Sequence, residues 1–349
     1  MNIETVDKLS ETGDLSDEEF LFLLSDDNPE LSEYLAKKAQ KVREKHYGKD
    51  VYIRGLIEFT NFCKNNCKYC GIRCGNKNAD RYRLGPEEII SCGDMGYELG
   101  FRTFVLQGGE DPYFTDDKMA DIVSALKDRH PDCAVTLSIG ERSRESYERL
   151  FDAGADRYLL RHETADKAHY ESLHPADMSF DNRMRCLNDL RDIGYQVGCG
   201  MMIGSPGQRL EHLVRDLRFL REFKPQMVGI GPFVPHHDTE YAHMPAGSVE
   251  LTLKLLSIIR LILPEVLLPA TTALGTLDPL GREKGLAAGA NVIMPNLSPT
   301  EVRGKYLLYD NKICTGEEAA ECIRCLTMRV KNAGYDIVED RGDHLSFKK

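Results

Sequence analysis

The sequence predicts an α/β protein whose main domain is a (β/α)8 barrel, and three observations lead to this prediction. From residue 49 onward, short apolar runs rich in β-branched residues alternate with amphipathic, helix-like segments. Eight such β-then-α units fill about 250 residues, the usual size of this barrel. Several helix-like segments end in a glycine shortly before a strand, where a left-handed residue commonly ends a helix: Gly100, Gly154, Gly194 and Gly289. A doubly wound open sheet is the structural alternative, but it rarely contains eight strands without a domain break.

The elements follow one another in a regular order. Residues 1–48 are predicted to form N-terminal helices, one of which begins at Ser16 because Glu19 completes a capping box, and another of which covers residues 31–46. The strands are predicted at residues 51–60, 103–107, 134–139, 157–161, 196–203, 227–231, 266–271 and 291–294. The helices between them are predicted at residues 86–99, 115–128, 143–152, 180–193, 209–223, 249–263 and 280–288. The barrel should therefore span residues 49–308, followed by a C-terminal extension at residues 309–349.

The composition is that of a globular protein in a reducing compartment. Of 349 residues, 42% are hydrophobic and 29% are charged. The 11 cysteines are clustered and odd in number, which favours metal ligation over disulfides. No signal-peptide pattern is present, and no apolar run reaches the roughly 20 residues of a membrane span. We therefore expect a cytoplasmic protein without a membrane partner, and the net charge of −11 gives no reason to expect nucleic acid.

Three cysteines follow the first predicted strand with the spacing C-x3-C-x2-C: Cys63, Cys67 and Cys70. Three thiolates in one short loop can hold three irons of a [4Fe–4S] cluster, which leaves the fourth iron open for a ligand. A structural zinc loop or a disulfide framework is a weaker alternative, because zinc normally takes four protein ligands. Cys74 would fill the open position if it were a fourth ligand, so we expect it to be a bystander.

Polar residues stand at the ends of the next strands, where the active sites of such barrels gather. The second strand is followed by Gln107, Gly108, Gly109 and Glu110, and glycines at this place let the backbone approach a ligand closely. Ser138 lies at the end of the third strand. The fourth strand ends in Arg161 and Glu163, which should point to the same side because they are two residues apart. A structural ion pair is the alternative for these two residues.

Further site residues are predicted at the same end of the barrel, where the strands end. Arg183 lies at a helix start, and Met202 should pack against a bulky ligand. The residues expected to line the rest of the cavity are Thr271, Thr272, Met294 and Tyr306. Few acid–base candidates appear, so no protein acid or base is assigned.

His236 and His237 are not expected to bind a metal. Adjacent side chains on an extended segment point in opposite directions, and no third ligand is evident in the sequence.

A second set of cysteines lies in the C-terminal extension with the spacing C-x7-C-x2-C: Cys314, Cys322 and Cys325. Three thiolates can again bind an iron–sulfur cluster, either [2Fe–2S] or [4Fe–4S]. Free thiols on a terminal helix are the alternative, since Cys322 and Cys325 would share one helical face.

These features resemble the radical S-adenosylmethionine (SAM) enzymes, and the chain is similar to the HydE family of [FeFe]-hydrogenase maturases over nearly its whole length. The similar segments are residues 57–63, 78–83, 105–113, 154–164, 227–233, 269–273 and 290–296. The resemblance implies a barrel of the radical SAM type, with SAM on the open iron of the [4Fe–4S] cluster and reductive cleavage to a 5′-deoxyadenosyl radical. It implies SAM contacts from Tyr69, Gln107, Gly108, Gly109, Glu110, Ser138, Arg161, Glu163, Arg183 and Met202.

The same resemblance implies a substrate and partners. The substrate would be an organometallic unit, a cysteine-bound iron carbonyl–cyanide supplied by the maturase HydG. HydF and an external electron donor would be further partners. Methylornithine synthase and biotin synthase share the barrel and first motif and stay open as alternatives, as does a non-catalytic iron–sulfur carrier.

Overall fold

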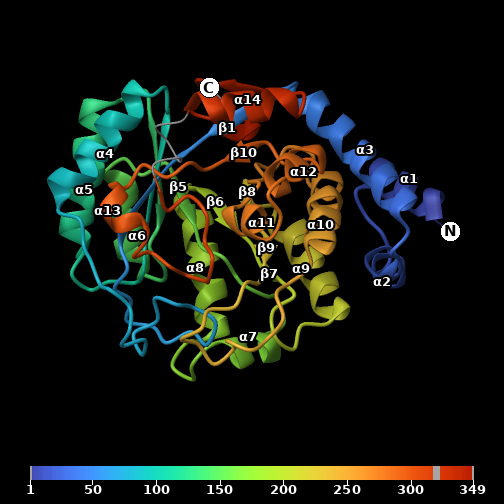
Figure 1. Ribbon diagram of the computed structural model, residues 1–349, viewed down its shortest axis with the longest axis horizontal. Helices are drawn as coiled ribbons and strands as arrows, with labels where there is room; N and C mark the ends of the chain where they lie inside the picture. The colour runs from blue at the N-terminus through green and yellow to red at the C-terminus, as the bar shows by residue number, and fades with distance from the viewer. Residues whose placement is uncertain (1, 317–322, 348–349) are drawn as a thin grey trace.

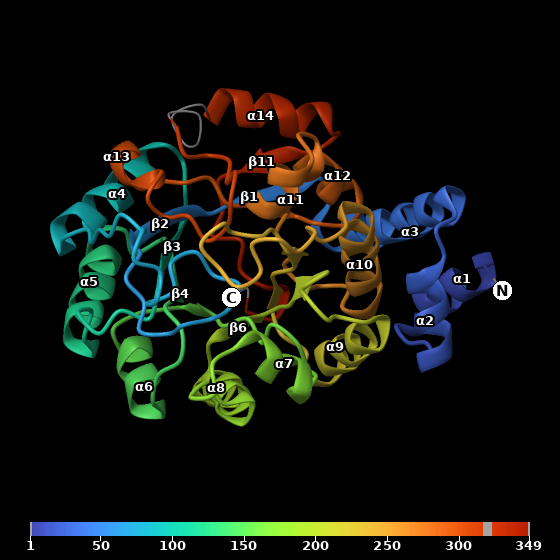
Figure 2. The same ribbon diagram turned by 60° about the horizontal axis from the view of Figure 1, so that its bottom comes forward.

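A computed structural model describes residues 2–316 and 323–347 of the chain. Figures 1 and 2 show a central ring of strands surrounded by helices, with the first three helices grouped at one side of the ring. The strands are β1 (Asp50–Ile53), β2 (Gly55–Thr60), β3 (Thr103–Gly108), β4 (Ala134–Ser138), β5 (Arg157–Leu159), β6 (Gln196–Cys199), β7 (Met202–Ile203), β8 (Met227–Val228), β9 (Gly231–Pro232), β10 (Val292–Ile293) and β11 (Asp336–Val338).

Most helices cover the outside of this ring, and the three that precede the barrel lie together beside it (Figure 2). Those before the barrel are α1 (Asn2–Thr12), α2 (Asp17–Ser25) and α3 (Pro29–Tyr47). Those that follow are α4 (Pro86–Glu98), α5 (Asp116–Arg129), α6 (Arg144–Asp152), α7 (Lys167–Leu173), α8 (Phe180–Ile193), α9 (Leu210–Phe223), α10 (Val249–Ile262), α11 (Thr272–Leu277), α12 (Gly281–Ala287), α13 (Thr300–Arg303), α14 (Ile323–Asn332) and the 3-10 helix η1 (Leu345–Phe347). None of these helices is both long and apolar enough to cross a membrane, within the residues described.

The predicted (β/α)8 barrel is confirmed by the strand pairing. Strands β2, β3, β4, β5, β6 and β8 pair in this order, all in parallel. Single bridges then join Met227 to Leu267, Pro269 to Val292, and Asn296 back to Leu56 in β2. The sheet thereby closes on itself, and β2 to β4 are buried at almost every position because helices cover their outer face.

Local sequence signals explain most helix ends. Ser16 forms the predicted capping box with Glu19 at the start of α2. The glycines expected to end helices all have positive φ, from 88° at Gly100 to 110° at Gly194. Side chains that accept a hydrogen bond from the first turn begin five of the barrel helices: Thr115, Ser143, Asp166, Ser179 and Ser248.

The observed strands differ from the predicted ones in two ways. Residues 196–203 and 227–231 each form two short strands, and the two segments approach closely at glycines between these strands: a Cβ on Gly200 would lie 1.9 Å from the Gly229 carbonyl oxygen. Residues 266–271 form only isolated bridges, and Pro269 has no N–H to donate to a ladder.

The C-terminal segment is part of the barrel floor. Strand β11 pairs in parallel with the first residues of β1. Asp343 forms a 2.6 Å ion pair with Arg157 at the start of β5 and accepts a hydrogen bond from Gln196 at the start of β6. This segment therefore covers the end of the barrel where the strands begin, opposite the loops that follow them. The domain limits at residues 48 and 308 stay a prediction.

Candidate functional site

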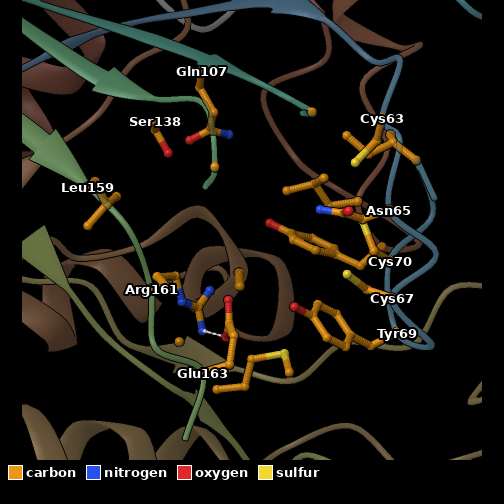
Figure 3. A pocket seen from close by; sticks show the side chains of 18 of the residues that line it. Cys63, Asn65, Cys67, Tyr69, Cys70, Gln107, Ser138, Leu159, Arg161 and Glu163 are labelled. Atoms are coloured by element: carbon orange, nitrogen blue, oxygen red, sulfur yellow. Dashed lines mark ion pairs between the residues drawn. The ribbon is translucent and has the colours of Figure 1, made fainter. Parts of the chain in front are cut away.

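One cavity of about 310 Å³ opens where the barrel strands end. Figure 3 shows the cysteine loop along one side and the ends of β3, β4 and β5 along the other. Most of the predicted site residues line it: Cys63, Cys67, Tyr69, Cys70, Gln107, Gly108, Gly109, Glu110, Ser138, Arg161, Glu163, Arg183, Met202, Thr271 and Tyr306. Thr272 and Met294 do not line this cavity: Thr272 is the first residue of α11, and Met294 packs against the cluster of Tyr47, Tyr52 and Met227.

The cysteine loop follows β2 and is held from several sides. Lys64 N donates to the Glu110 carbonyl at 2.9 Å, and Gly71 N donates to the Leu308 carbonyl at 2.9 Å. The guanidinium of Arg81 donates to the backbone carbonyls of the same loop, among them those of Ile72 at 2.8 Å and Arg73 at 2.7 Å. These contacts fix the loop before any metal binds. Sequence analysis did not find the role of Arg81, whose partners span residues 61–76.

The thiols of this loop fit a three-thiolate metal centre. Burial raises the pKa of the Cys70 thiol to about 12 and also raises the pKa of Cys63 and Cys67. Buried thiols of this kind are protonated on their own, and a bound metal cation replaces their protons. Cys74 is exposed and does not line the cavity. Among the described residues, the cysteine thiols that line the cavity are thus three, which suits an iron–sulfur cube with one open iron.

The end of β3 packs directly on this loop because Gly109 has no side chain. A Cβ there would lie 2.2 Å from the Phe62 carbonyl oxygen and 2.7 Å from the Cys63 Cβ. A Cβ on Gly140, whose φ is +80°, would likewise lie 2.0 Å from the Glu110 Cγ. Both glycines therefore make the room in which Glu110 and the cysteine loop meet.

Arg161 and Glu163 face the cavity with unfilled hydrogen-bonding capacity. Arg161 Nη2 lies 3.1 Å from Glu163 Oε2, and Figure 3 shows the two side chains pointing toward each other beside Tyr69. These atoms are close enough for an ion pair, yet neither is aligned for a hydrogen bond, and Arg161 Nε also has no partner among the described residues. Buried polar groups of this kind are costly to leave unpaired, so a polar ligand is expected between them.

Arg183 is held in place by two neighbours. Its Nε lies 2.5 Å from Glu141 Oε1, and its Nη1 donates to the Arg161 carbonyl at 2.5 Å. Burial opposes the charge on Arg183, but Tyr170 and Glu141 outweigh this effect and raise its pKa. Arg183 therefore stays charged and links the ends of β4 and β5 at the cavity wall.

Tyr69 is oriented by a histidine that sequence analysis missed. His174 Nδ1 donates to the Tyr170 carbonyl at 2.8 Å, so its Nε2 is the acceptor for the Tyr69 hydroxyl at 3.2 Å. Burial lowers the pKa of His174 to about 3, which keeps the ring neutral in this role. No local pattern marks His174, because it lies 105 residues from Tyr69 along the chain.

The histidine pair after β9 does not have the predicted geometry. The rings of His236 and His237 are stacked 4.4 Å apart, and Asp310 Oδ1 lies 2.7 Å from His237 Nδ1. The chain is not extended here: it turns, and Asp238 N donates to His236 Nδ1 at 3.1 Å. Asp310 therefore supplies the third donor that the sequence did not show: one ligand atom from each of His236, His237 and Asp310 lies within 4.8 Å of the others, close enough to hold a metal ion.

Comparison with known proteins defines the class first. Residues 57–220 match the family model of the radical SAM superfamily. A solved structure of methylornithine synthase superposes with a TM-score of 0.83 at 28% identity, covering 96% of this chain and 97% of that one. The maturase HydG has the same fold, with a TM-score of 0.81 at 22% identity over 97% of this chain and 76% of that one. The fold is therefore that of a radical SAM enzyme, a class that uses a [4Fe–4S] cluster and SAM.

Among curated proteins, the [FeFe] hydrogenase maturase subunit HydE of Thermotoga maritima is 49% identical over 311 residues, which cover 89% of this chain and 88% of that protein. The 3-methylornithine synthase of Methanosarcina acetivorans is 30% identical over 332 residues, covering 95% of this chain and 92% of that protein. The chain belongs to the HydE family.

Proposed function

We propose that this chain is a maturase that cleaves SAM reductively and acts on a cysteine-bound iron carbonyl–cyanide unit during assembly of the [FeFe]-hydrogenase H-cluster. The observation that carries the proposal is the meeting of three cysteine thiols with the unfilled Arg161–Glu163 pair in one cavity. The 49% identity to a HydE maturase supports the choice of substrate.

In this proposal Cys63, Cys67 and Cys70 hold the [4Fe–4S] cluster, and the remaining cavity receives SAM. When bound, the cluster supplies the electron that generates the 5′-deoxyadenosyl radical. The chain supplies the rest: Glu110 accepts from the ammonium group of SAM, and Arg161 and Glu163 pair with its polar groups. The apolar wall of Leu159, Phe233 and Val234 excludes water.

The partners follow from the proposed pathway. HydG would supply the organometallic unit, HydF would be a further partner, and an external donor would reduce the cluster. The proposed location is the cytoplasm, where free thiols stay reduced.

Methylornithine synthesis is the alternative reaction, because a 3-methylornithine synthase is 30% identical and shares the barrel. The anaerobically reconstituted protein should be given dithionite, SAM and a synthetic cysteine-bound iron carbonyl–cyanide complex, and separately an amino-acid mixture. We expect 5′-deoxyadenosine formation together with consumption of the complex, followed by infrared spectroscopy. Formation of 3-methylornithine from the amino-acid mixture, without any change in the complex, contradicts the proposed substrate.

We also propose that Cys314, Cys322 and Cys325 hold a second iron–sulfur cluster, outside the barrel cavity. Cys322 lies outside the described residues. Cys314 has a left-handed φ of +65°, and Arg282 Nη2 donates to its sulfur at 3.1 Å. Cys325 lies on an exposed face of α14 and is disulfide-bonded in the structure, so this bond must be reduced before Cys325 can bind iron.

Replacing these three cysteines by alanine should remove the iron beyond the first cluster and leave SAM cleavage largely intact, because none of the described members lines the cavity. Iron content per chain and 5′-deoxyadenosine yield measure the two effects. If the triple variant keeps all its iron, the second cluster is absent. If it keeps the barrel cluster but loses 5′-deoxyadenosine formation, the C-terminal extension takes part in the reaction.

A further inference from the structure

His162 lies between the two cavity residues Arg161 and Glu163 but points away from the cavity. Its side chain is fully buried, and its Nε2 lies 3.2 Å from Asp216 Oδ1 on α9. Its ring packs 4.7 Å from the ring of Phe219, one turn further along α9. Because α9 covers the outside of the barrel (Figure 2), His162 fastens the end of β5 to the helix behind it.

The hydrogen bonds fix the protonation of this pair. Gly200 N donates to His162 Nδ1 at 3.2 Å, so the proton of the neutral ring is on Nε2 and is donated to Asp216. Asp216 Oδ1 also accepts from the backbone N–H of Ala165 at 2.5 Å. One carboxylate thus holds the chain on both sides of Glu163, at residues 162 and 165.

The segment held in this way has an unusual backbone. Glu163 has a φ of +64°, in the left-handed region that non-glycine residues seldom adopt because it is sterically unfavourable. Its N–H donates to the Gly200 carbonyl at 3.0 Å. An unusual conformation persists only where the surroundings determine it, and here the surroundings are Gly200 and the His162–Asp216 pair.

The His162–Asp216 pair is also less favourable for stability than an apolar contact at the same place would be. Both side chains are completely buried, and Asp216 Oδ2 has no hydrogen-bond partner among the described residues. A buried charge with an unfilled oxygen is less favourable than apolar packing of the same volume. Apolar packing, however, could not hold two N–H groups at fixed positions beside Glu163.

We propose that His162 and Asp216 are positioning residues for the reaction, which hold Glu163 in its left-handed conformation and so aim Glu163 and Arg161 at SAM. The inference rests on the proposed function, in which this cavity binds SAM. Neither residue touches the cavity, so both act through the backbone of residues 161–165.

The test uses His162→Phe, which keeps the ring and its packing on Phe219 but removes both hydrogen bonds. We expect the dissociation constant of SAM, measured by its effect on the electron paramagnetic resonance spectrum of the reduced cluster, to rise about tenfold, since hydrogen bonds to a charged group are lost. KM for SAM should rise by a similar factor, with kcat changed less and iron content unchanged. Asp216→Leu tests the same link from the helix side, in case one variant does not fold. Asp216→Asn keeps an acceptor oxygen and should bind SAM within about threefold of the parent protein.

The matched control is His130→Phe. His130 Nε2 lies 2.8 Å from Asp94 Oδ1 between α5 and α4, and neither residue lines the cavity. This control should unfold at a lower temperature than the parent protein and bind SAM with unchanged affinity. If His162→Phe and Asp216→Leu lower the unfolding temperature as the control does, and SAM affinity stays at the parent value, the positioning role is wrong. Failure of the parent protein itself to bind SAM overturns the proposed function, and the inference with it.

Discussion

The Cys67→Ala variant is expected to lose the barrel cluster and to form no 5′-deoxyadenosine above background. Cys67 is one of three thiols that face the cavity, and its sulfur lies 3.6 Å from the sulfur of Met178 in the cavity wall. Removing it leaves one iron of the cube without a protein ligand, so the cluster should not persist. Iron and sulfide analysis, the spectrum of the dithionite-reduced protein and chromatography of the SAM cleavage products measure the loss.

Cys74→Ala is the matched control for this variant. Cys74 follows Cys70 by four residues in the same loop, but it is exposed and does not line the cavity. The control should keep the cluster and the activity of the parent protein. Undiminished SAM cleavage by Cys67→Ala, or an equal loss in Cys74→Ala, would sink the assignment of the three ligands.

The barrel could be predicted because its repeating unit leaves local signals. Helix caps such as Ser16 and helix-ending glycines such as Gly194 determine the backbone within a few residues, and the structure has both. Short helices such as α7 and α11 were not predicted, since six or seven residues carry too little periodicity. Helix α1 lies within the predicted N-terminal helical segment, but its bounds were not predicted, because its apolar face, which packs on α3 and α10, shows only a sparse apolar pattern.

The cavity could be predicted in large part for a similar reason. The carboxyl ends of the strands converge in this fold, so polar residues that follow them in sequence meet in space. Met294 and Thr272 show the limit of this rule: near a strand end, a shift of one residue along the chain moves a side chain from the cavity to the surrounding core or helix.

The supporting contacts could not be predicted. His174, Asp216 and Lys312 act on residues 54 to 254 positions away in sequence, and such pairs leave no spacing that a single sequence displays.

A buried ion pair between Glu58 and Lys312 should be the strongest single interaction between β2 and the segment that leads to Cys314. Glu58 Oε1 lies 2.6 Å from Lys312 Nζ, and their side chains are 1% and 6% exposed. Glu58 Oε2 accepts from Asn296 at 2.8 Å, and Lys312 also donates to the carbonyl of Tyr306 at 2.9 Å. The pair is therefore well satisfied, and it holds Tyr306 in the cavity wall.

Lys312→Met leaves the Glu58 carboxylate buried without its cation, so we expect the free energy of unfolding to fall by about 3–5 kcal/mol. Lys167→Met is the matched control, because Lys167 and Asp181 form an equally short 2.6 Å pair whose side chains are 54% and 72% exposed. Water and salt screen an exposed pair so that it contributes little, and the control should unfold almost as the parent protein does. Denaturant unfolding of the metal-free, reduced proteins gives both values.

The double variant Glu58→Gln/Lys312→Met separates the effect of losing the ion pair from the effect of leaving the Glu58 carboxylate buried without its cation. With no charge left to bury, it should be more stable than Lys312→Met alone, while Tyr306 still lacks the lysine that held its carbonyl. SAM affinity in the double variant then reports what that contact contributes to the cavity. Equal unfolding free energies for Lys312→Met and Lys167→Met would show that Glu58 finds another partner, and that the cavity wall does not depend on this pair.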